Sequence, residues 1–179
     1  FEVNGEQYVH ERATSTQQTG FSLVAQARNW MPEGAKGILW FGVDDTYTTV
    51  YCPMYAGMNG APENYKVGNG NMLQYSPTSA FWQFNQVSNF AYTRYCDMIV
   101  DIQKKQNYLE NSFIKEVQNV DERLMQNGTS EDEMRSIMTQ FSFSKASQTF
   151  NTWKSLYEFL LVKYMDGNVK KEKDGVFEH

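Results

Sequence analysis

Two adjacent carboxylates, Asp44 and Asp45, are the first candidates for chemistry in this sequence. Paired carboxylates can have different pKa values, so that one acts as a general acid and the other as a general base. They also stand between two strand-like runs, where aspartate is common because its side chain accepts hydrogen bonds from the nearby backbone. We favour the turn role over acid–base catalysis.

Cationic and amide side chains flank or enter the first strand-like run. The residues of this set are Arg12, Gln17, Gln18, Gln26 and Arg28. Arginine can hold a carboxylate by two parallel hydrogen bonds, and both kinds of side chain can stabilise an oxyanion. Because arginine is also common on protein surfaces, composition alone does not single out one member of the set.

Cysteine and histidine are too sparse for the usual nucleophile and metal sites. Cys52 and Cys96 have no neighbouring histidine and no CxxC pairing, so neither a zinc site nor a disulfide framework is indicated. His10 and His179 lie at the two ends of the chain and offer no Ser–His or Cys–His couple. We therefore predict no metal and no cofactor, and we expect both cysteines to be buried packing residues.

Aromatic and amide residues recur at helical spacing after residue 80. This set, which consists of Trp82, Asn85, Ser88, Asn89 and Tyr92, could line a pocket. An aromatic stripe at this spacing is more often part of a core, so we favour packing.

The first 75 residues are strand-like. Three runs predict strands: 21–27 alternates partly, 37–43 is almost continuously apolar, and 46–51 is rich in β-branched and aromatic residues. The last two are expected to be joined by a tight hairpin at the aspartates. The middle run is apolar on both faces, which implies a strand covered on both sides. Residues 55–75 are rich in glycine and asparagine and predict a loop.

The hydrophobic period changes to three and four from Ser76 onward, with Pro77 at the predicted first helical position. Helix is expected as far as Asn127-Gly128, with an irregularity near residues 104–106. Asn127 also opens a glycosylation sequon, but we favour the helix stop. Ser130 and Glu133 predict a capping box for a short helix, and a last helix is expected to end at Asp166-Gly167.

Strands followed by long helices predict an α+β fold in which the helices lie against one face of an antiparallel sheet. We divide the chain into a β-rich part over residues 1–75, a helical layer over residues 76–167 and a tail over residues 168–179. No internal repeat or low-complexity tract interrupts this organisation.

Composition excludes several classes of partner. The chain has 179 residues, of which 41% are hydrophobic and 15% aromatic, enough for a folded core. Its net charge is −5 and no cluster of lysine and arginine follows one face, so we expect no nucleic acid partner. No apolar run approaches the ~20 residues of a membrane span. Both ends look cut and the first residue is Phe1, so the compartment stays unknown.

Four blocks of the sequence resemble the dipeptidase A family of bacterial N-terminal-nucleophile peptidases. They occur in the family's order, and their co-occurrence carries the resemblance. The similar residues are Arg12, Ala13, Gln18–Phe21, Val24–Gln26 and Arg28; Trp40, Asp44, Asp45, Tyr47, Thr48, Val50, Tyr51, Pro53 and Tyr55–Gly57; Ser79–Trp82, Phe84 and Val87–Asn89; and Lys163, Tyr164, Asp166 and Gly167.

The resemblance implies that these strands and helices are the C-terminal portion of an αββα sandwich. In such an enzyme a cysteine at the mature N-terminus attacks a dipeptide while its own α-amine serves as the base, which needs no histidine. That cysteine would lie upstream of Phe1, so we expect the isolated chain to be inactive. Related amide hydrolases use an arginine shortly before this part of the sheet, and Arg12 is the corresponding candidate. The expected partners are a small peptide substrate and the remaining N-terminal part of the same protein.

Two other functions stay open at this point. The chain could be a non-catalytic domain whose aromatic residues and Asn/Gly-rich loop bind a peptide or a partner. Within the same superfamily, it could also belong to an amide hydrolase acting on bile-salt conjugates or penicillins. A cysteine exposed at the start of the mature chain would favour a peptidase over the binding domain.

Overall fold

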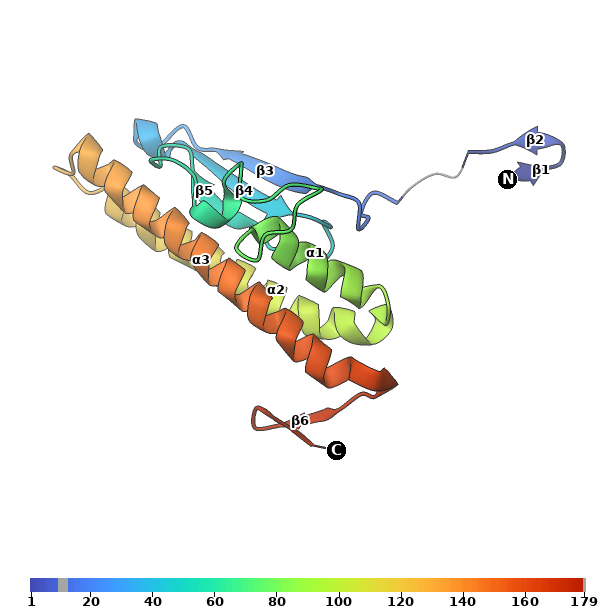
Figure 1. Cartoon of the computed structure of the whole chain (residues 1–179). Coiled ribbons are helices and arrows are strands. Elements are labelled where there is room, and N and C mark those ends of the chain that lie inside the picture. Colours follow the sequence, from blue (N-terminus) through green and yellow to red (C-terminus); the bar gives the residue numbers. More distant parts are fainter. Residues whose placement is uncertain (10–12, 179) are drawn as a thin grey trace.

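The computed structural model describes residues 1–9 and 13–178 (Figure 1). Its sheet is antiparallel, with the strand order β3-β4-β5, and consists of β3 (Phe21–Ala27), β4 (Gly37–Val43) and β5 (Cys52–Tyr55). The helices α1 (Ala80–Ala91), α2 (Tyr95–Leu124) and α3 (Glu131–Tyr164) follow in the chain. Strands followed by packed helices confirm the predicted α+β fold.

Shorter elements lie at the ends and in the connections. They are the hairpin of β1 (Glu2–Val3) and β2 (Glu6–Gln7), the 3-10 turns η1 (Glu33–Ala35), η2 (Glu63–Tyr65) and η3 (Met165–Gly167), and the hairpin of β6 (Lys171–Lys173) and β7 (Val176–Glu178). The last hairpin folds back toward α3 (Figure 1). There the ring centroids of Phe177 and Phe159 are 5.2 Å apart.

The third strand begins later than the sequence predicts. Residues 46–51 form turns and extended connection rather than a strand, and β5 starts at Cys52. Asp44 has a φ of 64°, and the hydroxyl of Thr49 donates to the carbonyl of Val43 at 2.7 Å. The backbone conformation of Asp44 and the hydrogen bond from Thr49 fold the segment back on itself. The predicted strand at 46–51 and the tight hairpin at Asp44-Asp45 are therefore wrong.

The helical boundaries also differ from the prediction. The first helix begins at Ala80 rather than after Ser76. The helical conformation is then interrupted at Arg94, whose φ of −154° is not helical. The helix α2 then runs without interruption through residues 104–106, where an irregularity was expected. Two helices were expected after Ser130, but α3 is continuous. The predicted cap is confirmed, since Ser130 accepts a hydrogen bond from the N–H of Glu133 at 3.2 Å.

The core lies between the helices and extends under the sheet. The stacked rings of Phe84 and Trp153, with centroids 4.7 Å apart, join α1 to α3. A second part of the core joins Ile38 and Tyr55 of the sheet to Met138 of α3. Burial of these large side chains, each worth roughly 1.5–3 kcal/mol, holds the helices on the sheet.

The strand β5 forms an edge of the sheet that the helices cover. The N–H of Tyr55 donates to the hydroxyl of Ser142 in α3 at 3.1 Å, and the N–H of Tyr51 donates to the carboxylate of Glu110 in α2 at 3.0 Å. Pro53, between them, has no N–H to satisfy. The outward-facing donors of this edge are therefore paired or absent.

The strand β3 forms the other edge and is exposed. Phe21, Leu23 and Val24 are 62%, 47% and 55% exposed. Because successive side chains of a strand point to opposite faces, β3 is open on both faces. Figure 1 shows β3 on the side of the sheet away from α2 and α3.

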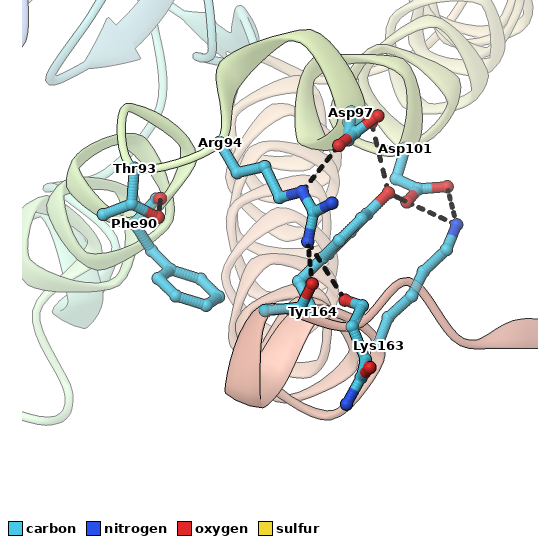
Figure 2. Close-up of polar contacts among 9 residues, drawn as sticks. Phe90, Thr93, Arg94, Asp97, Asp101, Lys163 and Tyr164 are labelled. Carbon is cyan, nitrogen blue, oxygen red and sulfur yellow. Dashed lines mark hydrogen bonds and ion pairs between the residues drawn. The ribbon is translucent and has the colours of Figure 1, made fainter. Parts of the chain in front are cut away.

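A polar network fastens the end of α3 to the start of α2 (Figure 2). Lys163 and Tyr164 both bond to the carboxylate of Asp101, each with a contact of 2.7 Å. Arg94 bonds to Asp97 at 2.6 Å and to the carbonyl of Gly167 at 2.8 Å. The Lys163–Gly167 block thus has a structural role in closing the helical layer.

Candidate functional site at the end of the central strand

The site lies where β4 ends and several segments meet. The N–H of Asp44 donates to the carbonyl of Gly20 at 2.9 Å, and this bond ties the end of β4 to the residue before β3. Asp44 and Asp45 are 1% and 0% exposed. The two carboxylates are therefore buried inside the connection and are not part of an exposed turn.

Asp45 is a junction for hydrogen bonds from three directions. Its carboxylate accepts from the hydroxyl of Ser15, from the N–H of Tyr47 at 3.0 Å and from the hydroxyl of Tyr92 at 2.7 Å. Burial of the Tyr92 hydroxyl and its bond to Asp45 raise the pKa of Tyr92. Asp45 thereby holds the segment before β3 and the end of α1 against the β4–β5 connection.

Asp44 is bound less completely. One carboxylate oxygen accepts from the side-chain amide of Asn85 at 2.9 Å, whereas Oδ2 has no hydrogen-bond partner among the described residues. The Ser88 hydroxyl on the same helix is also buried and unpaired within the described part of the chain. Burial raises the pKa of Asp44, and the bond from Asn85 opposes part of that rise.

Of the two arginines that the sequence suggests as substrate contacts, the structure describes only Arg28. Arg12 lies outside the described residues, as do His10 and His179. Arg28 is 3% exposed, and its guanidinium bonds to Asp121 of α2 and to the carbonyl of Ala35. Its charge is thus satisfied inside the protein.

The amide residues near β3 do not gather around one pocket. The side-chain oxygen of Gln26 accepts from the indole N–H of Trp40 at 2.9 Å, while Gln17 and Gln18 are exposed. The role of Arg12 at the substrate stays a prediction, because Arg12 lies outside the described residues.

The two cysteines have different environments. Cys52 is 0% exposed, and burial raises the pKa of its thiol to about 12. A buried thiol of this kind is a poor nucleophile because the thiolate is the reactive form. Cys96 is exposed on α2, so the prediction that both cysteines are buried is wrong. Its neighbour Tyr95 packs against the rings of Tyr47 and Tyr92.

Polar side chains on one side of α1 contribute to this site, although the sequence pattern favoured a packing role for them. Asn85 bonds to Asp44 and Tyr92 bonds to Asp45, while Asn89 donates back to the carbonyl of Asn85 at 2.9 Å. Trp82 lines a cavity of about 330 Å³ between α1 and the loop over residues 64–72. The helical spacing placed these residues on one side of α1, but their partners come from β4 and the loop.

The described residues include no group of three or more histidine, cysteine, aspartate or glutamate side chains placed to hold a metal ion. In the same part of the chain, no helix combines the length and the apolar composition that crossing a membrane requires.

Comparison with known families decides the family. The sequence model of peptidase family C69 matches residues 2–108, which is more than half of the chain. This chain belongs to peptidase family C69, the dipeptidase A family. The match includes the sheet, α1 and the aspartate site, and it supports a peptidase function for the protein. No curated protein matches the chain.

Membership of peptidase family C69 favours a peptidase over the non-catalytic binding domain. It agrees with the resemblance of the blocks around the sheet and α1, and it assigns the chain to a class that acts on peptides. The block at Lys163–Gly167 lies beyond the matched residues.

Proposed function

We propose that this chain is the C-terminal portion of a dipeptidase whose nucleophile is a cysteine at the mature N-terminus, upstream of Phe1. In this mechanism the thiol attacks the carbonyl of a dipeptide, and the α-amine of the same cysteine takes the proton. Membership of peptidase family C69 supports the substrate class.

The observation that carries the proposal is the exposed strand β3. Phe21, Leu23 and Val24 leave apolar surface open on both faces, and the described residues supply no strand on its outer side. Large exposed apolar patches mark surfaces that another element covers. The upstream part of the same protein is the proposed cover, since an αββα sandwich needs a second sheet against this one.

The thiols of the chain support an upstream nucleophile. Cys52 is buried, and burial raises the pKa of its thiol, so this side chain is a poor nucleophile. A cysteine peptidase needs a thiolate beside a base. Cys52 does not meet the first of these requirements.

Activity measurements on two forms of the protein test the proposal. A panel of dipeptides should be hydrolysed by the complete protein, and not by the 179-residue chain. Replacing the N-terminal cysteine of the complete protein by Ala should abolish turnover, whereas the Cys52→Ala and Cys96→Ala variants should keep it. Comparable turnover by the isolated chain would contradict the proposal.

We assign to Arg12 a place at the substrate in the complete enzyme. It precedes Ser15 by three residues, and the hydroxyl of Ser15 bonds to Asp45. A guanidinium can hold a carboxylate or a developing oxyanion by two parallel hydrogen bonds, and lysine cannot reproduce this fork. Arg12→Lys should therefore lower kcat/KM by about 10²-fold if the group stabilises transition-state charge.

The control for Arg12 is Arg28→Lys, which changes a buried arginine that pairs with Asp121. This variant should lower stability more than turnover of the folded enzyme. Unchanged kinetics in a folded Arg12→Lys protein would remove Arg12 from the substrate site and leave it a surface or interlayer ion pair.

A further inference from the structure

A cavity of about 330 Å³ lies between the first turn of α1 and the loop over residues 64–72. Its walls include the side chains of Tyr65, Phe81, Trp82 and Met72, which are apolar or aromatic. The loop is held in place by polar bonds, among them the side-chain amide of Asn69 to the carbonyl of Glu63 at 3.2 Å and the hydroxyl of Ser76 to the side-chain oxygen of Asn69 at 2.6 Å. The cavity is therefore formed before any ligand binds.

The polar end of the cavity is the N-terminus of α1. Ser79, Ala80, Phe81 and Trp82 all line it. The N–H groups of a first helical turn have no partner within the helix, and the helix dipole places positive charge there. No acidic side chain occupies this turn to neutralise that charge.

Ser79 is a second, independent sign of a ligand. It holds the N-cap position, yet its hydroxyl makes no capping bond to the helix. The residue is only 7% exposed and lines the cavity, and its side chain makes no capping hydrogen bond among the described residues. Serine at this position normally satisfies a helix N–H, so the side chain is available to another acceptor.

The charges around the cavity favour an anion. Lys66 lines it, and none of the described residues of its lining is an aspartate or glutamate. The nearest carboxylate on the same turn, Glu63, is 77% exposed and pairs with Lys66 at 2.8 Å. This exposed pair can open at little cost, because such pairs contribute roughly 0–1 kcal/mol.

We propose that this cavity binds the C-terminal carboxylate of a short peptide whose last side chain is apolar. The carboxylate meets the first turn of α1, Ser79 and Lys66, and the apolar side chain packs against Phe81 and Trp82. The choice of a peptide as ligand rests on the proposed dipeptidase function, whereas the carboxylate site rests on the cavity alone.

Binding to the 179-residue chain tests the site without any need for turnover. The probes are the dipeptide Ala-Leu and its C-terminal amide, titrated into isotopically labelled protein and followed by ¹H–¹⁵N spectra. The acid should shift the amide signals of residues 79–82, and the amide should bind about 10–100-fold more weakly because it cannot accept charge-assisted hydrogen bonds.

Two variants locate the carboxylate. Ser79→Ala should weaken binding of the acid by about 3–10-fold and leave the already weak amide unchanged. Lys66→Gln should weaken the acid in the same direction. Its matched control is Lys36→Gln, because Lys36 pairs with Glu33 at the same spacing far from the cavity; this change should have no effect.

The outcomes separate this site from the proposed activity. Equal affinity for acid and amide, shifts centred on other residues, or no binding up to about 10 mM, a weak limit on the usual affinity scale, would overturn the carboxylate site even if the complete enzyme hydrolyses dipeptides. Specific binding of the acid together with an inactive complete protein would instead refute the dipeptidase proposal and leave the site standing.

Discussion

The two edge strands of the sheet, β5 and β3, differ in how far the rest of the chain covers them. At β5 the outward N–H groups of Tyr51 and Tyr55 are taken up by Glu110 and Ser142, and Pro53 has none to offer. At β3 the side chains of Phe21, Leu23 and Val24 are exposed on both faces. One edge is closed within this chain, and the other leaves apolar side chains exposed.

The difference follows from the free energy of unpaired groups. A buried N–H without a partner costs ~1–3 kcal/mol, so an edge packed under helices requires side-chain acceptors at fixed positions. An exposed edge bonds to water and has no such requirement, but its apolar side chains gain nothing until they are covered. The predictions below test this contrast in order of expected effect.

The largest effect is expected at Asp121, which closes the buried side. Its carboxylate accepts from Arg28 and from the hydroxyl of Tyr55 at 2.7 Å. Asp121→Ala leaves the guanidinium of Arg28 buried and unpaired, which should lower the free energy of unfolding by about 3–5 kcal/mol. Urea denaturation measures the change. The control, Glu122→Ala on the exposed side of α2, should stay within ~0.5 kcal/mol; equal effects would refute the role of the pair.

A smaller effect is expected at Ser142, which receives the N–H of Tyr55. Ser142→Ala leaves that N–H buried without an acceptor and should cost about 1–3 kcal/mol. Ser144→Ala is the matched control, since Ser144 is exposed on the same helix. Thermal unfolding of both variants gives the comparison. If the Tyr55 amide also stays protected from hydrogen exchange in Ser142→Ala, the edge is closed by something other than this hydroxyl.

Between the two edges, Asp44 should make stability depend on pH. Its pKa is raised by burial, so the folded protein holds the proton more tightly than the unfolded chain. The associated stability is complete below the unfolded value of about 3.8 and is lost as the pH rises through the raised value.

The isosteric variant Asp44→Asn removes this titration and should be at least as stable as the wild type at pH 7. Free energies of unfolding measured from pH 4 to pH 8 provide the test. Asp45→Asn is the comparison, because Asp45 accepts three hydrogen bonds, and this variant should lose about 1.5–3 kcal/mol at pH 7. A pH profile unchanged by Asp44→Asn would assign the titration to another group.

The smallest effect is expected on the open edge. Leu23→Ala should change the stability of this chain by less than ~0.5 kcal/mol, because Leu23 is 47% exposed. In the complete protein the same change should cost about 2–5 kcal/mol if the upstream sheet covers it. Parallel denaturation of the two forms decides the matter, and equal small effects in both would mean that β3 stays uncovered.

Some of this arrangement could be predicted from local sequence. The runs 21–27 and 37–43 form strands as expected, and Ser130 caps α3. These features depend on residues close together in the chain, whose periodicity and hydrogen bonds are local. The family could also be predicted, because it depends on the order of blocks along the sequence.

The candidate site could be predicted only in part. Asp44 and Asp45 were singled out as a pair, but not their burial or their bonds to Asn85, Ser15 and Tyr92. These partners are 30 or more residues away in the chain, so no short motif contains them. Asn85 and Tyr92 were recognised from the sequence as part of a helical stripe on α1, but their spacing was interpreted as core packing.

By itself, then, the sequence determined the element types, the helix cap and the family, since each depends on residue types at short or ordered spacing. Tertiary structure decided where β5 begins, why Arg28 is an internal ion pair with Asp121, and why Ser79 lines a cavity instead of capping its helix. The physical reason is that hydrogen-bond satisfaction and burial are properties of segments brought together in space. The same residue type is a surface charge, a buried tie or a ligand depending on what the fold places beside it.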